Sequence, residues 1–173
     1  MNISFSEVNK ESIDDYKLIS KWNNDESIKH LIIPNFTEGD LPDSTPEQLY
    51  KQALSQAGMH HFLILADGTA IGEVSVQIDP PQLHKKVKNT GWIGITIGEE
   101  KYRGRGIGRP AIEFLEKKCR ELNLTRIELG VFAFNHNAIK FYKNMGYKEF
   151  SILNNFTFYQ GRWQSDIRME KYL

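Results

Sequence analysis

The stretch from Gly91 to Leu122 changes its hydrophobic period half-way, and this change constrains the fold more than any other feature of the chain. Isoleucines at every second position over residues 93–97 predict a β-strand with one apolar face. Apolar residues then recur at helical spacing over residues 111–122, which predicts an amphipathic helix. A strand that passes into a helix through a short turn predicts a fold in which helices pack on a sheet.

The remaining elements follow from the same two periods and from the turn residues. Asp67-Gly68 between two apolar runs predicts a hairpin. Thr45-Pro46, with Gln48 three residues after the threonine, predicts a capped helix start. We expect strands at residues 3–5, 62–66, 71–78, 91–98, 127–131, 147–153 and 163–172, helices from Ser12 and over 45–57, 111–122 and 137–145, and a loop over 31–44. This order predicts a mixed sheet with helices on its faces, in the α/β or α+β class.

Length and charge narrow the class of protein. The 173 residues suit a single domain, 1–173. The 22 basic and 22 acidic side chains give zero net charge, so we expect neither a nucleic-acid partner nor an anionic membrane. No apolar run is long enough to span a bilayer, and we see no secretory signal at the start, so we expect a cytoplasmic protein. The single cysteine, Cys119, excludes an internal disulfide and a cysteine-based zinc site. We expect no metal.

The segment Tyr102–Pro110 joins the predicted strand to the predicted helix and concentrates glycine and arginine. Three glycines in five residues allow backbone N–H groups to converge, and the helix start adds positive charge, so the turn favours an anion such as a phosphate. The segment lacks the P-loop pattern of glycine, four residues and Gly-Lys-Ser/Thr. Arg109 occupies the position of the third glycine of a dinucleotide fingerprint, so a nucleotide-binding module is a weak alternative.

Two motifs carry a family resemblance. Arg103-x-x-Gly106-x-Gly108 resembles the Gln/Arg-x-x-Gly-x-Gly/Ala signature of the GNAT superfamily of N-acetyltransferases. The block from Asn135 to Tyr147 is similar to the Asn-x-x-Ala-x-x-x-Tyr-x-x-x-Gly-Phe pattern of the same family. The stretch Trp22-Asn23-Asn24-Asp25 resembles branches that act on ribosomal-protein N-termini and, equally, aminoglycoside acetyltransferases.

The resemblance implies a single domain with a mostly antiparallel sheet that splays at the acetyl-coenzyme A site. It implies direct transfer of an acetyl group, in a ternary complex, to a primary amine of a small molecule or a protein N-terminus. A backbone N–H near Ile97 would stabilise the oxyanion. The implied cofactor-binding residues are Ile95, Thr96, Ile97, Arg103, Gly104, Arg105, Gly106, Ile107, Gly108, Arg109, Asn135, Ala138 and Tyr142.

The resemblance also implies a proton donor and a proton acceptor. Tyr142 matches the family tyrosine that protonates the departing thiolate. Related enzymes often place a glutamate near position 92 as the base, but Trp92 stands there and cannot accept a proton. Glu73, on the polar side of the neighbouring strand, is the substitute we expect. Asp166 on the last strand is a second candidate base or a contact for the cationic acceptor, and Trp92 is a further expected acceptor contact.

The acceptor and the oligomeric state, monomer or homodimer, stay open. By fold position, residues 31–44 and 154–162 should shape the acceptor site, and Glu38, Asp40 and Asp43 in the first segment suit a cationic amine. The absence of a glutamate at position 92 keeps one alternative open, a non-catalytic domain of the same fold that binds or senses acyl-coenzyme A.

Overall fold

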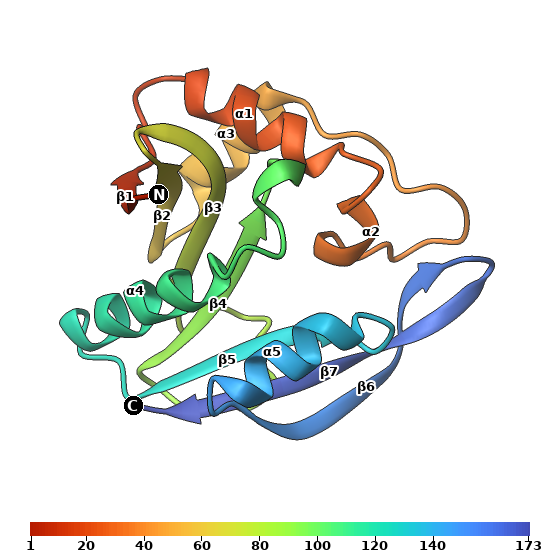
Figure 1. Cartoon of the computed structure of the whole chain (residues 1–173). Coiled ribbons are helices and arrows are strands. Elements are labelled where there is room, and N and C mark those ends of the chain that lie inside the picture. The colour runs from red at the N-terminus through yellow and green to blue at the C-terminus, as the bar shows by residue number, and fades with distance from the viewer.

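The structure, a computed structural model, describes residues 1–173 and contains one seven-stranded sheet covered by helices (Figure 1). No helix is both long and apolar enough to cross a bilayer. In chain order, the elements are β1 (Ile3–Glu7), α1 (Asp14–Asn23), α2 (Lys29–Ile32), α3 (Pro46–Ser55), β2 (Met59–Ala66), β3 (Thr69–Ile78), β4 (Thr90–Ile97), a 3₁₀ turn (Glu100–Tyr102), α4 (Gly108–Glu121), β5 (Arg126–Phe132), α5 (His136–Asn144), β6 (Lys148–Tyr159) and β7 (Arg162–Tyr172).

The sheet separates in its middle. The strand order is β1-β2-β3-β4-β5-β7-β6, and every neighbouring pair is antiparallel except β4 and β5. These two strands are parallel and pair only where Thr90–Trp92 meets Arg126–Glu128. Beyond Trp92 the two strands diverge, so the β5 side of β4 carries no strand from Ile93 to Ile97. The predicted mixed, mostly antiparallel sheet and its splay are confirmed.

Helices cover both faces, as predicted. Leu63 and Ile64 are adjacent on β2 and therefore point to opposite faces of the sheet. Ile64 belongs to the main core with α4 and the apolar side of α5. Leu63 belongs to a second cluster under α1 and α3, which contains Tyr16 and Trp22. Each face of the N-terminal half of the sheet thus has its own core.

The ends of the helices and strands agree with the predictions in some places and differ in others. The capping box of Thr45 and Gln48 is present. Ser12 is not the helix cap, because α1 begins at Asp14 after Ile13; the Ser12 hydroxyl still accepts the Asp14 backbone N–H at 3.2 Å. The strand predicted to end at residue 153 continues to Tyr159 as β6, past a register shift between Leu153 and Thr157 that disguises the alternation. The helical turn α2 was not predicted.

Candidate active site

The glycine-rich turn adopts the conformation that its sequence requires. Gly104 and Gly106 have φ angles of +71° and +80°, which side chains disfavour, and nothing lies within 4 Å of where a Cβ would be. Gly108 opens α4, and a Cβ there would lie 2.9 Å from the Phe141 ring. The turn therefore exposes its backbone, and the missing side chain of Gly108 lets α5 approach the start of α4.

A cavity of about 650 Å³ lies between the end of β4, this turn and α5. Eight of the thirteen predicted cofactor-binding residues line it: Ile95, Ile97, Gly104, Gly106, Gly108, Arg109, Ala138 and Tyr142. Its other lining residues are Asn137, Phe141, Asn144 and Met145. The cavity thus joins an apolar wall to a helix N-terminus, and we call it the turn cavity.

The other predicted cofactor-binding residues lie elsewhere. Thr96 points to the opposite side of β4, into a smaller cavity. The Ile107 side chain is buried in the main core, so only its backbone is available to a ligand. The Asn135 side chain caps α5 by accepting the Ala138 N–H at 3.2 Å, and Arg105 is exposed.

Arg103 is held by the protein itself. Its guanidinium donates hydrogen bonds to the backbone oxygens of Ile97 and Gly98, to the Asp25 carboxylate at 2.7 Å and to the Ser27 hydroxyl at 2.7 Å. Hydrogen bonds from Ser27 and Arg103 lower the pKa of Asp25 to about 2. This side chain therefore ties the turn to the segment after α1, and Arg105 and Arg109 are the exposed arginines of the turn.

Tyr142 has the properties of a proton donor. Its side chain lines the turn cavity from α5. Burial raises the pKa of its phenol to about 12, so the hydroxyl carries its proton at neutral pH. Phe141 and Tyr147 hold the ring, with centroids at 5.2 and 5.7 Å.

Trp92 and Asp166 lie in a buried charged cluster on the face of β5 and β7 opposite α5. The Arg168 guanidinium stacks on Trp92 at 4.7 Å. Arg168 Nε lies 2.8 Å from Asp166 Oδ2 without the alignment of a hydrogen bond, so the contact is an ion pair. Burial outweighs this cation and raises the pKa of Asp166 to about 6. Neither Trp92 nor Asp166 lines the turn cavity, the smaller cavity that contains Thr96, or a third cavity beside the β6–β7 hairpin.

Glu73 is paired, and its partner is a residue that the sequence did not single out. Glu73 Oε2 lies 2.5 Å from His61 Nε2. The β2–β3 register places His61 opposite Ser75, one position along the same face from Glu73. The two side chains are about 15% exposed and line a cavity of about 180 Å³ under α1 and α3.

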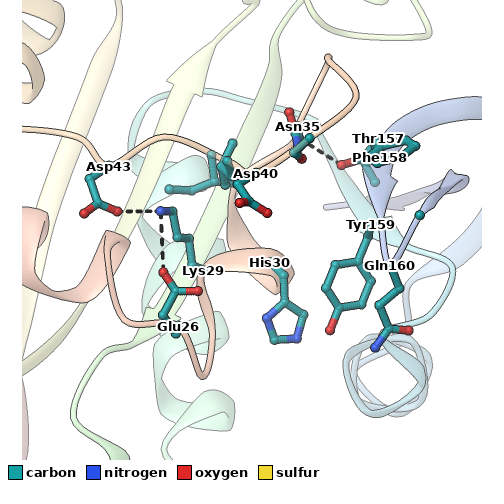
Figure 2. A pocket seen from close by; sticks show the side chains of 14 residues that line it. Glu26, Lys29, His30, Asn35, Asp40, Asp43, Thr157, Phe158, Tyr159 and Gln160 are labelled. Carbon is teal, nitrogen blue, oxygen red and sulfur yellow. Dashed lines mark hydrogen bonds and ion pairs between the residues drawn. The ribbon is translucent and has the colours of Figure 1, made fainter.

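A third cavity, of about 640 Å³, lies between α2, the following loop and the tip of the β6–β7 hairpin (Figure 2). It brings together the two segments predicted to shape the acceptor site, with Asn35–Asp43 on one side and Thr157–Gly161 on the other. The backbone N–H of Asn35 donates to the Thr157 hydroxyl at 2.9 Å, which joins the two walls. We call it the hairpin cavity.

The hairpin cavity has an acidic and an aromatic side. Glu26, Asp40 and Asp43 line it against one ammonium group, that of Lys29, which leaves an excess of two negative charges. Lys29 is buried between Asp43, at 2.5 Å, and Glu26, at 3.8 Å. On the other side, the His30 ring stacks on Tyr159 with centroids 4.7 Å apart (Figure 2). The arrangement favours a cationic ligand that also has a flat or apolar part.

The two large cavities are linked by the chain between β5 and α5. The Phe134 ring stacks on the Tyr159 ring with centroids 4.7 Å apart, and Tyr159 lines the hairpin cavity. Shortly after Phe134 in the chain, Asn137 and Ala138 line the turn cavity. The segment from Phe134 to Ala138 therefore contacts the walls of both cavities.

The family comparison agrees with this geometry. The model of the acetyltransferase (GNAT) family matches residues 25–147, which include both motifs and the 3₁₀ turn between β4 and the glycines. The chain belongs to the GNAT family. The predicted enzyme class, an N-acetyltransferase, is confirmed.

Individual relatives are distant. The uncharacterised N-acetyltransferase YdgE of Bacillus subtilis is 26% identical over 70% of this chain and 84% of its own length. An N-alpha-acetyltransferase of Sulfurisphaera tokodaii is 28% identical over 67% of this chain and 72% of its own.

Two solved structures share the fold over almost the whole chain. A ribosomal-protein-alanine N-acetyltransferase from Brucella melitensis has a TM-score of 0.78 at 21% identity and covers 98% of this chain and 99% of its own. A spermidine N-acetyltransferase from Vibrio cholerae, solved with CoA and spermine, has a TM-score of 0.79 at 22% identity and covers 98% and 95%. The fold of this GNAT chain is therefore shared by enzymes with different acceptors.

The sequence motifs missed the residues that lie outside them. His61, Tyr16 and His30 line cavities but stand outside both motifs, and Tyr159 was covered only by the predicted acceptor segment 154–162. The polar alternation of β3 was a signal for Glu73, and the same face of β2 would have provided its partner if the pairing register had been known.

Proposed function

We propose that this GNAT enzyme uses acetyl-coenzyme A and transfers its acetyl group directly to the primary amine of a cationic small molecule or of a peptide N-terminus. The observation that carries the proposal is the turn cavity. It adjoins the free edge of β4 and ends at the glycine backbone and the start of α4. A molecule with a slender, amide-bearing arm joined to a pyrophosphate, as in coenzyme A, matches that order of surfaces.

The residues fit coenzyme A by their chemistry. Backbone N–H groups from Arg105 to Arg109 can donate to the pyrophosphate, and Arg109 adds a cation on the lining of the cavity. The β4 backbone near Ile95 and Ile97 can pair with the pantetheine arm as an added strand would, since β5 has separated there. The bound molecule supplies an activated acetyl group on sulfur.

The protein then has three tasks. A backbone N–H of β4 near Ile97 stabilises the oxygen of the reacting carbonyl. Tyr142, whose proton is retained at neutral pH, donates it to the departing sulfur. Glu73 takes the role of the base and accepts a proton from the acceptor amine. We assign it this role because Trp92 stands where related enzymes often have a carboxylate. These roles rest on the placement of the side chains around β4.

The part of the acceptor away from the reacting amine belongs in the hairpin cavity, which shares no lining residue with the turn cavity or with the cavity of Glu73. The negative excess of the hairpin cavity favours an ammonium group, and its aromatic side favours an apolar stem next to that group. The names of the structural neighbours include both a protein N-terminus and a polyamine as acceptors, and each is cationic at neutral pH. Trp92 and Asp166 stay predicted acceptor contacts, with no support from the cavity lining.

The test has two steps. Calorimetry with coenzyme A, ATP and NAD should show binding of coenzyme A alone. Thiol release from acetyl-coenzyme A should then be measured with peptides that begin with alanine or serine, spermidine, an aminoglycoside and free amino acids. We expect release with at least one cationic amine. Coenzyme A binding without release for any of them would favour a non-catalytic, acyl-coenzyme A-sensing domain, and the absence of binding would overturn the proposal.

A further inference from the structure

The cavity of about 180 Å³ under α1 and α3 is polar but contains no cation. It is lined by α1, α3 and the facing sides of β2, β3 and β4. Its polar side chains are Tyr16, Asn23, Gln52, Gln56, His61, Glu73, Ser75 and Thr96, with no lysine or arginine among them. Its volume accommodates several water molecules, and polar cavities of this size hold water. We call it the dyad cavity, after His61 and Glu73.

The contact between His61 and Glu73 defines its floor. His61 Nε2 lies 2.5 Å from Glu73 Oε2, and opposite an ionised carboxylate, which has no proton to give, His61 donates its Nε2–H. His61 Nδ1 and Glu73 Oε1 make no hydrogen bond within the protein. The pair therefore has a free acceptor on each side and can take up one more proton.

Tyr16 provides an independent sign that the cavity contains a ligand. Its side chain is 2% exposed, and its hydroxyl has no hydrogen-bond partner within the protein. Burial, with smaller contributions that include the charge of Glu73, raises the pKa of this phenol, so it keeps its proton. A buried O–H donor without a partner is costly, which places a water molecule against it in the dyad cavity.

The dyad cavity reaches the strand on which the reaction depends. Gly94, Ile95 and Thr96 of β4 form one of its walls, and Ile95 also lines the turn cavity. A Cβ on Gly94 would lie on the dyad side, 3.2 Å from Ser75 Oγ, so its absence leaves the β4 backbone open to the dyad cavity. Water on the dyad side therefore lies against the part of β4 that carries no strand on its β5 side.

The surroundings of the pair contain few other titrating groups. From α1, Tyr16 faces the cavity, and from α3, Tyr50 packs edge-on against Tyr16 with centroids 5.3 Å apart. β4 contributes no titratable side chain to the lining.

From these contacts we propose that His61 and Glu73 act as one proton-accepting unit, which removes the proton of the acceptor ammonium through water held by Tyr16. The inference rests on the proposed function and adds two residues to it. An alkylammonium with a pKa near 10.4 is neutral in roughly one molecule in 2,500 at pH 7, so a proton acceptor has a large effect on rate. In this role His61 is a positioning residue that shares the proton taken up by Glu73.

The proton balance is complete. One proton passes from the acceptor ammonium through water to the dyad, which later returns it to solvent. The nitrogen then forms the C–N bond as the C–S bond breaks. The nitrogen loses its second proton, which restores the one that Tyr142 gives to sulfur.

The kinetic test uses His61→Gln, Glu73→Gln and Tyr16→Phe, with His60→Gln as the matched control. In His61→Gln, the new amide keeps an N–H near the position of Nε2 but cannot take up a proton. His60 is adjacent, on the opposite face of β2, and lines none of the three cavities. With spermidine and an alanine-initiated peptide as acceptors, we expect kcat/KM at pH 7 to fall about 100-fold for Glu73→Gln, about tenfold for His61→Gln and about threefold for Tyr16→Phe.

The pH profile separates proton transfer from mere support of the fold. The acid limb of kcat/KM should differ from that of the wild type in both His61→Gln and Glu73→Gln, while His60→Gln should follow the wild type. An unshifted acid limb in a folded His61→Gln protein would overturn the inference. If acetyl-coenzyme A is not used with either amine, the proposed function fails, and the next measurement still decides the dyad.

Nuclear magnetic resonance of ¹⁵N-histidine-labelled protein without acceptor provides that measurement. The Nε2–H proton of His61 should be strongly deshielded by its short hydrogen bond to the carboxylate, and Glu73→Gln should remove that deshielding. The signals of His60 should be the same in both proteins. A His61 Nε2–H signal that is the same in the wild type and in Glu73→Gln would overturn the proposal.

Discussion

The turn cavity and the hairpin cavity are almost equal in volume, about 650 and 640 Å³, but they are built in opposite ways. The first is made mostly of backbone and apolar side chains, with Arg109 as its one charged side chain, within one stretch from β4 to α5. The second is made of charged and aromatic side chains from two segments more than a hundred residues apart. A site made of backbone needs particular residues at fixed spacing, which a motif records. A site made of side chains can change its charges while the fold stays, so its ligand varies among relatives.

The largest effect should come from Tyr142, the only residue with a side-chain hydroxyl in the lining of the turn cavity. Tyr142→Phe should lower turnover about ten- to a thousandfold, because the departing sulfur loses its proton donor, with little change in coenzyme A affinity. Steady-state kinetics with calorimetry measures both. Tyr147→Phe is the control, since Tyr147 contacts the Tyr142 ring but its hydroxyl lies 3.3 Å from Glu116, outside the cavity. Equal turnover of the Tyr142→Phe protein and the wild type would contradict the assignment.

The backbone origin of the turn cavity is tested at Gly106. Gly106→Val places a branched side chain at φ +80° and should weaken coenzyme A binding at least about tenfold, or roughly 1.4 kcal/mol. Gly68→Val is matched to it: φ is +82°, the space around it is open, and it lies in the β2–β3 turn away from the cavities. The two variants should lose similar stability, so calorimetry isolates the effect on the ligand. A folded Gly106→Val protein with normal affinity would remove the turn from the site.

The two arginines of the turn sharpen the comparison between backbone and side-chain roles. Arg105→Glu should raise the KM for acetyl-coenzyme A several-fold at low salt, more than it lowers turnover, and the difference should shrink as salt screens the charge. Arg103→Ala should instead lower the melting temperature, because the guanidinium bonds to Asp25, Ser27 and the end of β4 are lost. Normal KM values for both Arg105→Ala and Arg105→Glu at low salt would make Arg105 a surface charge only.

The sequence predicted the elements that repeat a period and the site that follows a motif. It did not predict contacts that depend on register. Counting back from the Asp67-Gly68 turn without interruption pairs Phe62 with Glu73 and puts His60 on the face of Glu73. A register shift after Ile64 moves the pairing by one residue, so Leu63 lies opposite Glu73 and His61 takes that face. Nothing local in the sequence marks the shift.

The acceptor side was predicted only as two segments with acidic residues, and one charge there tests what the cavity adds. Of the acidic residues in the predicted loop, Asp40 and Asp43 line the hairpin cavity and Glu38 does not. Asp43 is paired with Lys29, whereas Asp40 makes no ion pair. Asp40 is therefore the carboxylate most available to a cationic acceptor.

Asp40→Asn should raise the KM for spermidine about two- to fivefold at low salt, the range of one exposed ion pair, and leave the KM for acetyl-coenzyme A unchanged. Glu38→Gln removes the same charge two residues away, outside the cavity. If the two variants raise the acceptor KM equally, the acceptor responds only to the overall negative potential of the loop. If Asp40→Asn acts alone, the charge acts locally within the cavity, because at 0.1 M salt an exposed charge loses most of its influence beyond about one Debye length, near 10 Å.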